Sequence, residues 1–180
     1  MHLRHGGKQQ LSEASMSISP QLETFLAESC TNYEVVSHPY SERAANTARS
    51  ACIPDRTMAK AVVLKDGNGY VMAVMPSRNR LMLAWLNMRL DRNLKLVQET
   101  TLQDLFPDCQ PGAIPAMGIA YGMKTVWDDA LNTVADIYIE GGNHRELIHM
   151  HRNEFQKLMY GQPHAAISCD IEEEEAYRSC

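Results

Sequence analysis

The sequence predicts an α+β domain in which a mixed, mostly antiparallel sheet or open barrel is flanked by helices. Three observations lead to this class. Two β-rich runs, residues 58–65 and 70–76, flank the turn sequence DGNG at 66–69, which is typical of a hairpin. Predicted strands outnumber predicted helices along the chain. Finally, 44% of the 180 residues are apolar, which suits one core of ordinary size.

The first predicted element is a helix that ends near Cys30. Ser19 can cap its N-terminus, Pro20 suits its first position, and apolar residues then recur three and four positions apart. The Ala-rich segment 41–52 and the segments 81–90 and 153–159 are also expected to be helical. Thr100 or Thr101 can cap a short helix that ends at residue 106, before a proline.

Further strands are expected on both sides of a long loop. Residues 33–38 form a strand that a proline ends, and residues 94–98, 123–127 and 136–140 are three more. A Gly-Gly pair breaks the last of these, and residues 146–151 can continue as another strand. Between them, residues 107–118 contain three prolines and two glycines, so this segment is expected to be a loop.

One folded domain, residues 16–160, is the simplest division of the chain. Residues 1–15 are polar and aperiodic, as in a disordered leader or extension, and residues 161–180 are expected to form an acidic tail. The five irregularly spaced cysteines favour a reducing cytoplasm over a disulfide framework. The formal net charge of −5 argues against a protein that coats duplex DNA, and no apolar run is long enough for a membrane helix.

Lys60 is the first residue that could carry chemistry. Strand alternation places it on the same face as Val62 and Leu64, within an otherwise apolar run. Because lysine is rarely buried without a partner, its stem could pack while the ammonium group reaches water. In the alternative interpretation, the ammonium group points into a cleft and meets an anion.

The loop residues 112–118, with the sequence GAIPAMG, are the second candidate. Glycine lets backbone N–H groups approach a ligand and proline stiffens the loop, so these amides could bind a carbonyl or phosphate oxygen. An ordinary connection could have the same composition. If the loop is functional, we expect Lys60 to stand across a solvent-reachable hollow from it.

Three histidines form a cluster in the sequence NHRELIHMH. The spacing of His144, His149 and His151 does not match the helical i, i+4 pair of a zinc site. If residues 146–151 form a strand, His149 and His151 share a face and could bind a metal ion. Surface or capping roles are the preferred interpretation, and no metal site is expected.

Two other features could bind or react. Cys109 could be a nucleophile with the distant His38 or His144, although the spacing supplies no activating base. Residues 76–95 contain five basic residues and one acidic residue, either on a solvated helix face or as a phosphate-binding patch. In the second interpretation, Arg78 and Arg80 contact the backbone of a single-stranded RNA end.

Taken together, these segments resemble the YbaK-like family of aminoacyl-tRNA editing domains, which are free-standing relatives of the editing insertion in bacterial prolyl-tRNA synthetase. Each motif alone is weak, whereas the ordered set is more specific and covers about residues 20 to 160. The matching motifs are HP at 38–39, MAKAVVL at 58–64, AVMP at 73–76, LFPDC at 105–109, GAIP at 112–115 with Gly118, and IYIEGG at 137–142.

The resemblance also implies site residues. The family's essential lysine falls on Lys60, while its G-x-x-x-P loop has Ala116 at the proline position and a proline one residue earlier. The segment after the Gly-Gly pair often carries polar substrate contacts in relatives, and here it offers Asn143 and His144. The expected substrate contacts are His38, Gly112, Ala113, Ile114, Pro115, Gly118, Gly141, Gly142 and His144.

The function implied by the resemblance is hydrolysis of the ester that joins a small mischarged amino acid (Ala, Cys or Ser) to the CCA end of a tRNA. In this scheme no metal or cofactor takes part, Lys60 is a fixed cation, and a hydroxyl of the tRNA's terminal ribose assists the water. A synthetase partner could deliver the tRNA. Two alternatives stay open: a non-catalytic module that holds aminoacyl ends or nucleotides, and a thiol hydrolase that uses Cys109.

Overall fold

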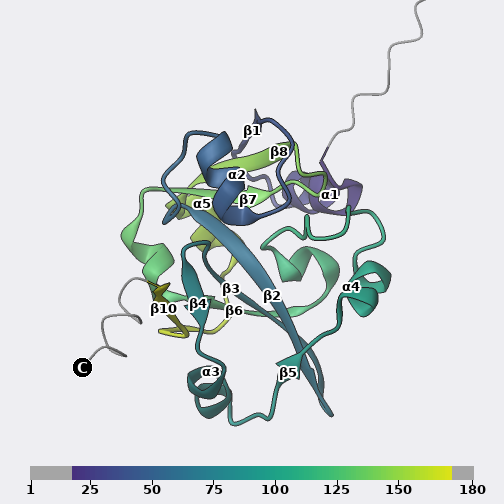
Figure 1. Cartoon of the computed structure of the whole chain (residues 1–180), viewed down its shortest axis with the longest axis vertical. Coiled ribbons are helices and arrows are strands. Elements are labelled where there is room, and N and C mark those ends of the chain that lie inside the picture. The colour runs from purple at the N-terminus through teal and green to yellow at the C-terminus, as the bar shows by residue number, and fades with distance from the viewer. Residues whose placement is uncertain (1–17, 172–180) are drawn as a thin grey trace, which may run out of the picture.

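The computed structural model describes residues 18–171 of the chain (Figure 1). The expected leader, residues 1–15, and the last part of the expected tail lie outside the described residues. The helices are α1 (Pro20–Glu28), α2 (Ala44–Ser50), α3 (Leu83–Leu90), α4 (Glu99–Leu105), α5 (Arg152–Leu158) and the 3-10 helices η1 (Gly118–Tyr121) and η2 (Asp129–Thr133). The strands are β1 (Glu34–Ser37), β2 (Met58–Asp66), β3 (Gly69–Pro76), β4 (Asn79–Leu81), β5 (Lys95–Leu96), β6 (Lys124–Asp128), β7 (Asp136–Glu140), β8 (Glu146–His151), β9 (His164–Ala165) and β10 (Ser168–Asp170).

The main sheet is mixed and open. Its strands follow the order β1-β8-β7-β2-β3-β6-β9, with β5 paired to β2 beside this path, and β10 pairs with β4 in a second small sheet. Neighbouring pairs are antiparallel except for β2 with β7, β3 with β6 and β6 with β9. The predicted α+β class, with a mixed and mostly antiparallel sheet flanked by helices, is confirmed.

The predicted hairpin is formed by β2 and β3, which cross the molecule in Figure 1 from α2 toward β5. At its tip Asp66 pairs with Gly69, which has a φ of 107°. Glycine adopts this backbone conformation readily, whereas other residues are strained in it. The side chain of Asp66 accepts a hydrogen bond from the N–H of Asn68 at 2.8 Å. This Asx turn fixes the register of β2, and with it the face on which Lys60 lies.

Strand β2 divides the core into two main clusters. Ala59 and Val63 pack on the side that also holds α1, η1 and α5. Leu64 and the partly buried Val62 pack on the other side, with Leu86 of α3. A third, smaller cluster lies under α2, where Ala48, Met58 and Leu147 are buried together. None of the helices within residues 18–171 is long and apolar enough to cross a bilayer.

The structured part of the chain extends past the expected boundary at residue 160. Strands β9 and β10 lie in the segment expected to be an acidic tail. The carboxylate of Asp128 accepts hydrogen bonds from Ile167 N at 2.9 Å and from Ser168 Oγ at 2.8 Å, while Ile167 itself is fully buried. The return of the chain to the sheet therefore depends on one buried carboxylate and one apolar side chain.

Smaller differences concern element ends. Residues 79–81 form the short strand β4, so α3 begins at Leu83 rather than at residue 81. The cap position of α4 is Gln98, and neither expected threonine occupies it. Strands β7 and β8 have the predicted ends, and the other predicted helices and strands are found with ends shifted by one to a few residues.

Gly118 has no room for a side chain, and this gives a test of the packing. A Cβ atom there would lie 2.6 Å from Thr125 Oγ1 and 2.9 Å from Met72 Cβ. We expect Gly118→Ala to lower the free energy of unfolding by about 1–3 kcal/mol, measured by urea denaturation. The control is Gly67→Ala, where a Cβ would meet nothing within 4 Å. Equal stability of the two variants would contradict this packing.

Candidate functional site

Three loops meet at the turn that joins β7 to β8. We call their junction the three-loop site, and it consists of residues 38–42, 109–114 and 140–146. A Cβ atom at Gly112 would lie 3.6 Å from His144 Cε1, and the ring of Tyr40 lies 5.4 Å from the His144 ring. The Nε2 atom of His144 lies 2.8 Å from the carbonyl oxygen of Pro111. The structure thus brings together the predicted residues Gly112 and His144, which are 32 positions apart in the sequence.

Glu140 holds the turn that carries His144. Its carboxylate is buried and accepts a hydrogen bond from His144 N at 3.1 Å. Burial raises the pKa of Glu140 to about 7, although the charge of His144 and the N–H groups of His144, Gly141 and Gly142 act in the opposite direction. Glu140 is not among the site residues predicted from the sequence, because an isolated glutamate at a strand end carries no signal until its burial is known.

The turn between β7 and β8 is held tightly. Asn143 Oδ1 accepts hydrogen bonds from the N–H groups of Arg145 and Glu146, each at 3.0 Å, and His144 adopts a left-handed φ of 59°. Gly141 and Gly142 are buried, and a Cβ at Gly142 would lie 3.0 Å from Ser19 Cβ. Both glycines therefore let the turn pack closely against the start of α1, and His144 is the residue they position.

The proline-stiffened loop offers fewer amides than expected. Ala113, Pro115 and Gly118 are buried, and the N–H of Ala113 donates to the carbonyl oxygen of Gln110 at 2.9 Å. Within residues 18–171, the N–H groups of Gly112 and Ile114 donate no hydrogen bond. The N–H groups of Gly112 and Ile114 are thus available to a ligand, whereas that of Ala113 is already used.

His38 lies beside the site at the end of β1. Its ring is buried, its Nδ1 lies 2.7 Å from the carbonyl oxygen of Pro39, and its backbone N–H donates to Arg145 at 2.8 Å. Its buried Nε2 has no hydrogen-bond partner among the described residues. Because an unsatisfied buried nitrogen is uncommon in folded proteins, the Nε2 atom of His38 is a candidate contact for a ligand.

Lys60 is half-buried and lines a hollow of about 320 Å³ together with Arg80, Leu81 and Leu96. Burial, and secondarily the charge of Arg80, lowers the pKa of Lys60. This arrangement agrees with the interpretation in which the lysine points into a hollow. Arg80 is exposed, whereas Arg78 forms ion pairs with Asp170 at 2.6 Å and Asp55 at 3.7 Å.

The lysine does not line the same hollow as the loop. Residues Gly112 and Ile114 border a separate small cavity beneath α4, so the expected direct opposition of Lys60 to this loop is not seen. Lys60 and the three-loop site are connected through the pairing of β2 with β7. The last register pair of β2 with β7 joins Ala59 to Ile139, so by strand alternation the next residues, Lys60 and Glu140, lie on the same face.

Cys109 is poorly suited to nucleophilic catalysis. Its Sγ lies 3.3 Å from the hydroxyl of Tyr121 and 3.8 Å from a carboxylate oxygen of Asp108, and Ser19 Oγ lies 2.7 Å from the same hydroxyl. Burial raises the pKa of the Cys109 thiol to about 11. Burial therefore disfavours the thiolate that the thiol-hydrolase alternative requires.

Another hollow, of about 990 Å³, lies at the hairpin tip. It is bordered by Asp66 and Arg92, whose guanidinium donates to that carboxylate at 2.8 Å from Nε. This pairing holds the pKa of Asp66 at about 2. Arg92 and Lys95 of the basic segment 76–95 border this hollow, whereas Lys60, Arg78, Arg80 and the residues of the three-loop site do not.

Comparison with known proteins gives a family match and several structures of similar fold. A family model described as an aminoacyl-tRNA editing domain matches residues 38–158, which contain the three-loop site and Lys60. None of the curated proteins compared with the chain matches it.

Several solved structures share the fold. A proposed trans-editing enzyme for prolyl tRNA synthetase is 21% identical, with a TM-score of 0.74 over 85% of this chain and 99% of that chain. The hypothetical protein APE2540 is 17% identical, with a TM-score of 0.73 over 83% of this chain and 99% of its own. A protein from Marinobacter aquaeolei VT8, described as acting in signal transduction, is 20% identical with a TM-score of 0.68; the match covers 83% of this chain and only 30% of that longer one.

The buried carboxylate gives a pH test. Since the pKa of Glu140 rises from 4.5 to about 7 on folding, the folded state resists ionisation of this group. The contribution of Glu140 to the free energy of unfolding should therefore fall by up to ~3 kcal/mol as the pH rises from 4.5 to about 7, and it should stay constant at higher pH. In Glu140→Gln this component should vanish from the pH profile of urea unfolding. Parallel profiles of the two proteins would contradict the assignment.

Proposed function

Because the chain belongs to the aminoacyl-tRNA editing domain family, we propose that it hydrolyses the ester between a tRNA and a small, wrongly attached amino acid such as Ala, Cys or Ser. The observation that carries this proposal is the match over residues 38–158, with Lys60 in a hollow beside a second cation. Family membership supplies the reaction class, and the residues of this chain suggest how it is carried out.

Lys60 and Arg80 form the anion-binding part of the proposed site. Both border the same hollow, and burial destabilises the charged form of Lys60 when no anion is present. A phosphate of the tRNA acceptor end would stabilise that charge, so the hollow favours an anionic ligand. Binding limited to this end is compatible with a protein whose net charge is −5.

The ester would then lie toward the three-loop site, on the side of the sheet that Lys60 shares with Glu140. Attack of water on the ester carbonyl gives a tetrahedral oxyanion, and its collapse breaks the bond to the ribose oxygen. One proton of the water passes to that oxygen, which leaves as the free terminal hydroxyl of the tRNA, and the other passes to solvent as the amino acid leaves with its carboxylate. The unpaired N–H groups of Gly112 and Ile114 are the candidate donors to the oxyanion, each worth about 3 kcal/mol where such donors have been measured. Lys60 acts as a fixed cation, and the terminal ribose hydroxyl positions the water.

Selection among amino acids would depend on the size of the pocket. A hydrophobic pocket discriminates by only about 1–3 kcal/mol for each methylene group, so a synthetase needs a second site that removes small errors. Since one structural relative is described as a proposed trans-editing enzyme for prolyl tRNA synthetase, we include tRNA-Pro among the substrates and such a synthetase as the delivering partner.

A non-catalytic role is the second candidate. It is favoured by Ala116, which replaces the family's loop proline and lies fully buried in the core. If this change alters the loop so that the ester is not placed for attack, the chain would bind the aminoacyl end without hydrolysing it. Binding of charged tRNA with no turnover on any aminoacyl-tRNA would support this role.

The decisive test replaces the buried cation. Lys60→Ala should lower kcat/KM for deacylation of Ala-, Cys- or Ser-charged tRNA, including tRNA-Pro, by at least about 100-fold, because a preorganised charge is lost. The matched control is Lys65→Ala, which removes an exposed lysine from the far end of the same strand and should keep full activity. Circular dichroism and Tm check that both variants fold. Full activity of Lys60→Ala would exclude this site.

A second variant addresses the thiol. Cys109→Ala should deacylate within about threefold of the wild type, since a thiol with a pKa of about 11 supplies almost no thiolate at neutral pH. Loss of activity with an unchanged Tm would restore the thiol mechanism.

A further inference from the structure

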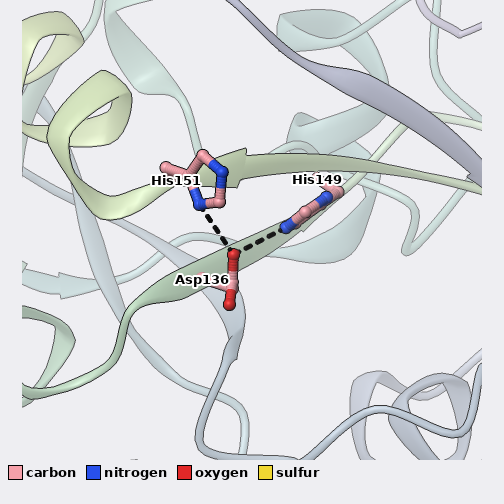
Figure 2. Close-up of side chains that lie close together, drawn as sticks. All are labelled: Asp136, His149 and His151. Atoms are coloured by element: carbon pink, nitrogen blue, oxygen red, sulfur yellow. Dashed lines mark hydrogen bonds and ion pairs between the residues drawn. The ribbon is translucent and has the colours of Figure 1, made fainter.

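Strands β7 and β8 place three metal-ligating side chains together, away from the three-loop site. In the antiparallel register Asp136 pairs with His151 and Tyr138 with His149. Because alternate residues of a strand share a face, Asp136, His149 and His151 all lie on one face of the sheet. Figure 2 shows both imidazole rings turned toward the Asp136 carboxylate.

The three groups meet at one point. Asp136 Oδ1 lies 2.9 Å from His149 Nε2 and 2.9 Å from His151 Nδ1. One ligand atom from each residue lies within 4.8 Å of the other two. A tetrahedral zinc ion with bonds of about 2.0–2.1 Å separates its ligand atoms by roughly 3.3 Å. Small side-chain rotations are therefore enough to admit an ion between these atoms.

Neighbouring residues orient His149 for this role. Its ring stacks on Tyr138, with centroids 4.6 Å apart and planes 17° from parallel. Its other nitrogen, Nδ1, lies 3.5 Å from a carboxylate oxygen of Glu34 on β1. A carboxylate on the far nitrogen of a metal-binding histidine fixes the tautomer that leaves Nε2 free to bind the metal. His149 side-chain exposure is 18% and that of His151 is 78%, so the point is reachable from solvent.

We propose that Asp136, His149 and His151 bind a divalent transition-metal ion, with zinc as the expected cation and water at its remaining position. Two imidazoles and one carboxylate form a ligand set that suits zinc and disfavours magnesium or calcium, which prefer oxygen ligands. Binding replaces the hydrogen bonds from the imidazoles to Asp136 with bonds to the metal, and any proton on the ligating nitrogens passes to solvent.

This site is separate from the proposed deacylation chemistry and does not depend on it. Gly141 lies five positions after Asp136 along β7 and its turn, which is roughly 17 Å at 3.4 Å per residue. The ion would join β7 to β8 at the end opposite the turn that holds Glu140 and His144. Its expected effect is therefore on the stability of the strand pair that positions the three-loop site.

The test uses the full chain after removal of metals with a chelator. Titration with ZnCl2 in a calorimeter should show one saturable site, and zinc should raise Tm by several degrees because it binds the folded state preferentially. Cobalt(II) should give the intense visible bands of a low-coordinate site. His151→Gln changes an exposed residue, and it should weaken binding at least about tenfold, as should His149→Gln.

The matched control is His164→Gln. His164 Nδ1 lies 2.6 Å from Asp129, so this pair reproduces one histidine–aspartate contact without the third ligand. This variant should bind zinc like the wild type. Absence of saturable binding would overturn the proposal and leave the cluster as a carboxylate that holds two imidazoles. Binding that persists at full strength in His149→Gln and His151→Gln, through other histidines or cysteines, would overturn it equally.

Discussion

The structure depends most on the position of β2, which packs against the core on both of its faces. Ala59 and Val63 contact the cluster under α1 and α5, while Leu64 contacts the cluster beside α3. Because β2 also pairs with β3, β5 and β7, its register fixes the relative placement of both main clusters. Lys60 interrupts this apolar strand at a point where the packing leaves a hollow, so the least favourable position for a charge is also where we propose that an anion binds.

The sequence predicted the elements whose signals are local. The DGNG turn identified the hairpin because its residues favour a tight reversal, and strand β7 was predicted with its observed ends, residues 136–140. Strands β9 and β10 contain two and three residues, too few for an alternating pattern to appear. Strand β9 pairs with β6 and β10 pairs with β4, while Asp128 holds the segment at Ile167, which is 39 positions away in the chain.

The candidate site could also be predicted only where the signal is local in the sequence. Lys60 could be recognised from its apolar neighbours, and Gly112 and His144 from motif order. The role of Glu140 depends on burial and on a turn that folds back over its carboxylate, neither of which a single sequence encodes locally. Likewise, the meeting of Asp136 with two histidines needs the register of β7 and β8, which pairs residues that are 15 positions apart in the chain. The expectation of surface histidines lacked this information.

The two-sided environment of β2 also limits how the chain length can vary. Since successive side chains alternate between faces, deleting one residue between Lys60 and the hairpin tip would exchange the two faces of the preceding residues. The ammonium group would then enter the cluster beneath α1, and a small alanine would line the hollow. A substitution along this strand changes the packing of one side chain. An insertion or deletion of one residue moves every preceding side chain of the strand to the opposite face. A change in chain length is therefore expected to be tolerated outside β2 and not within it.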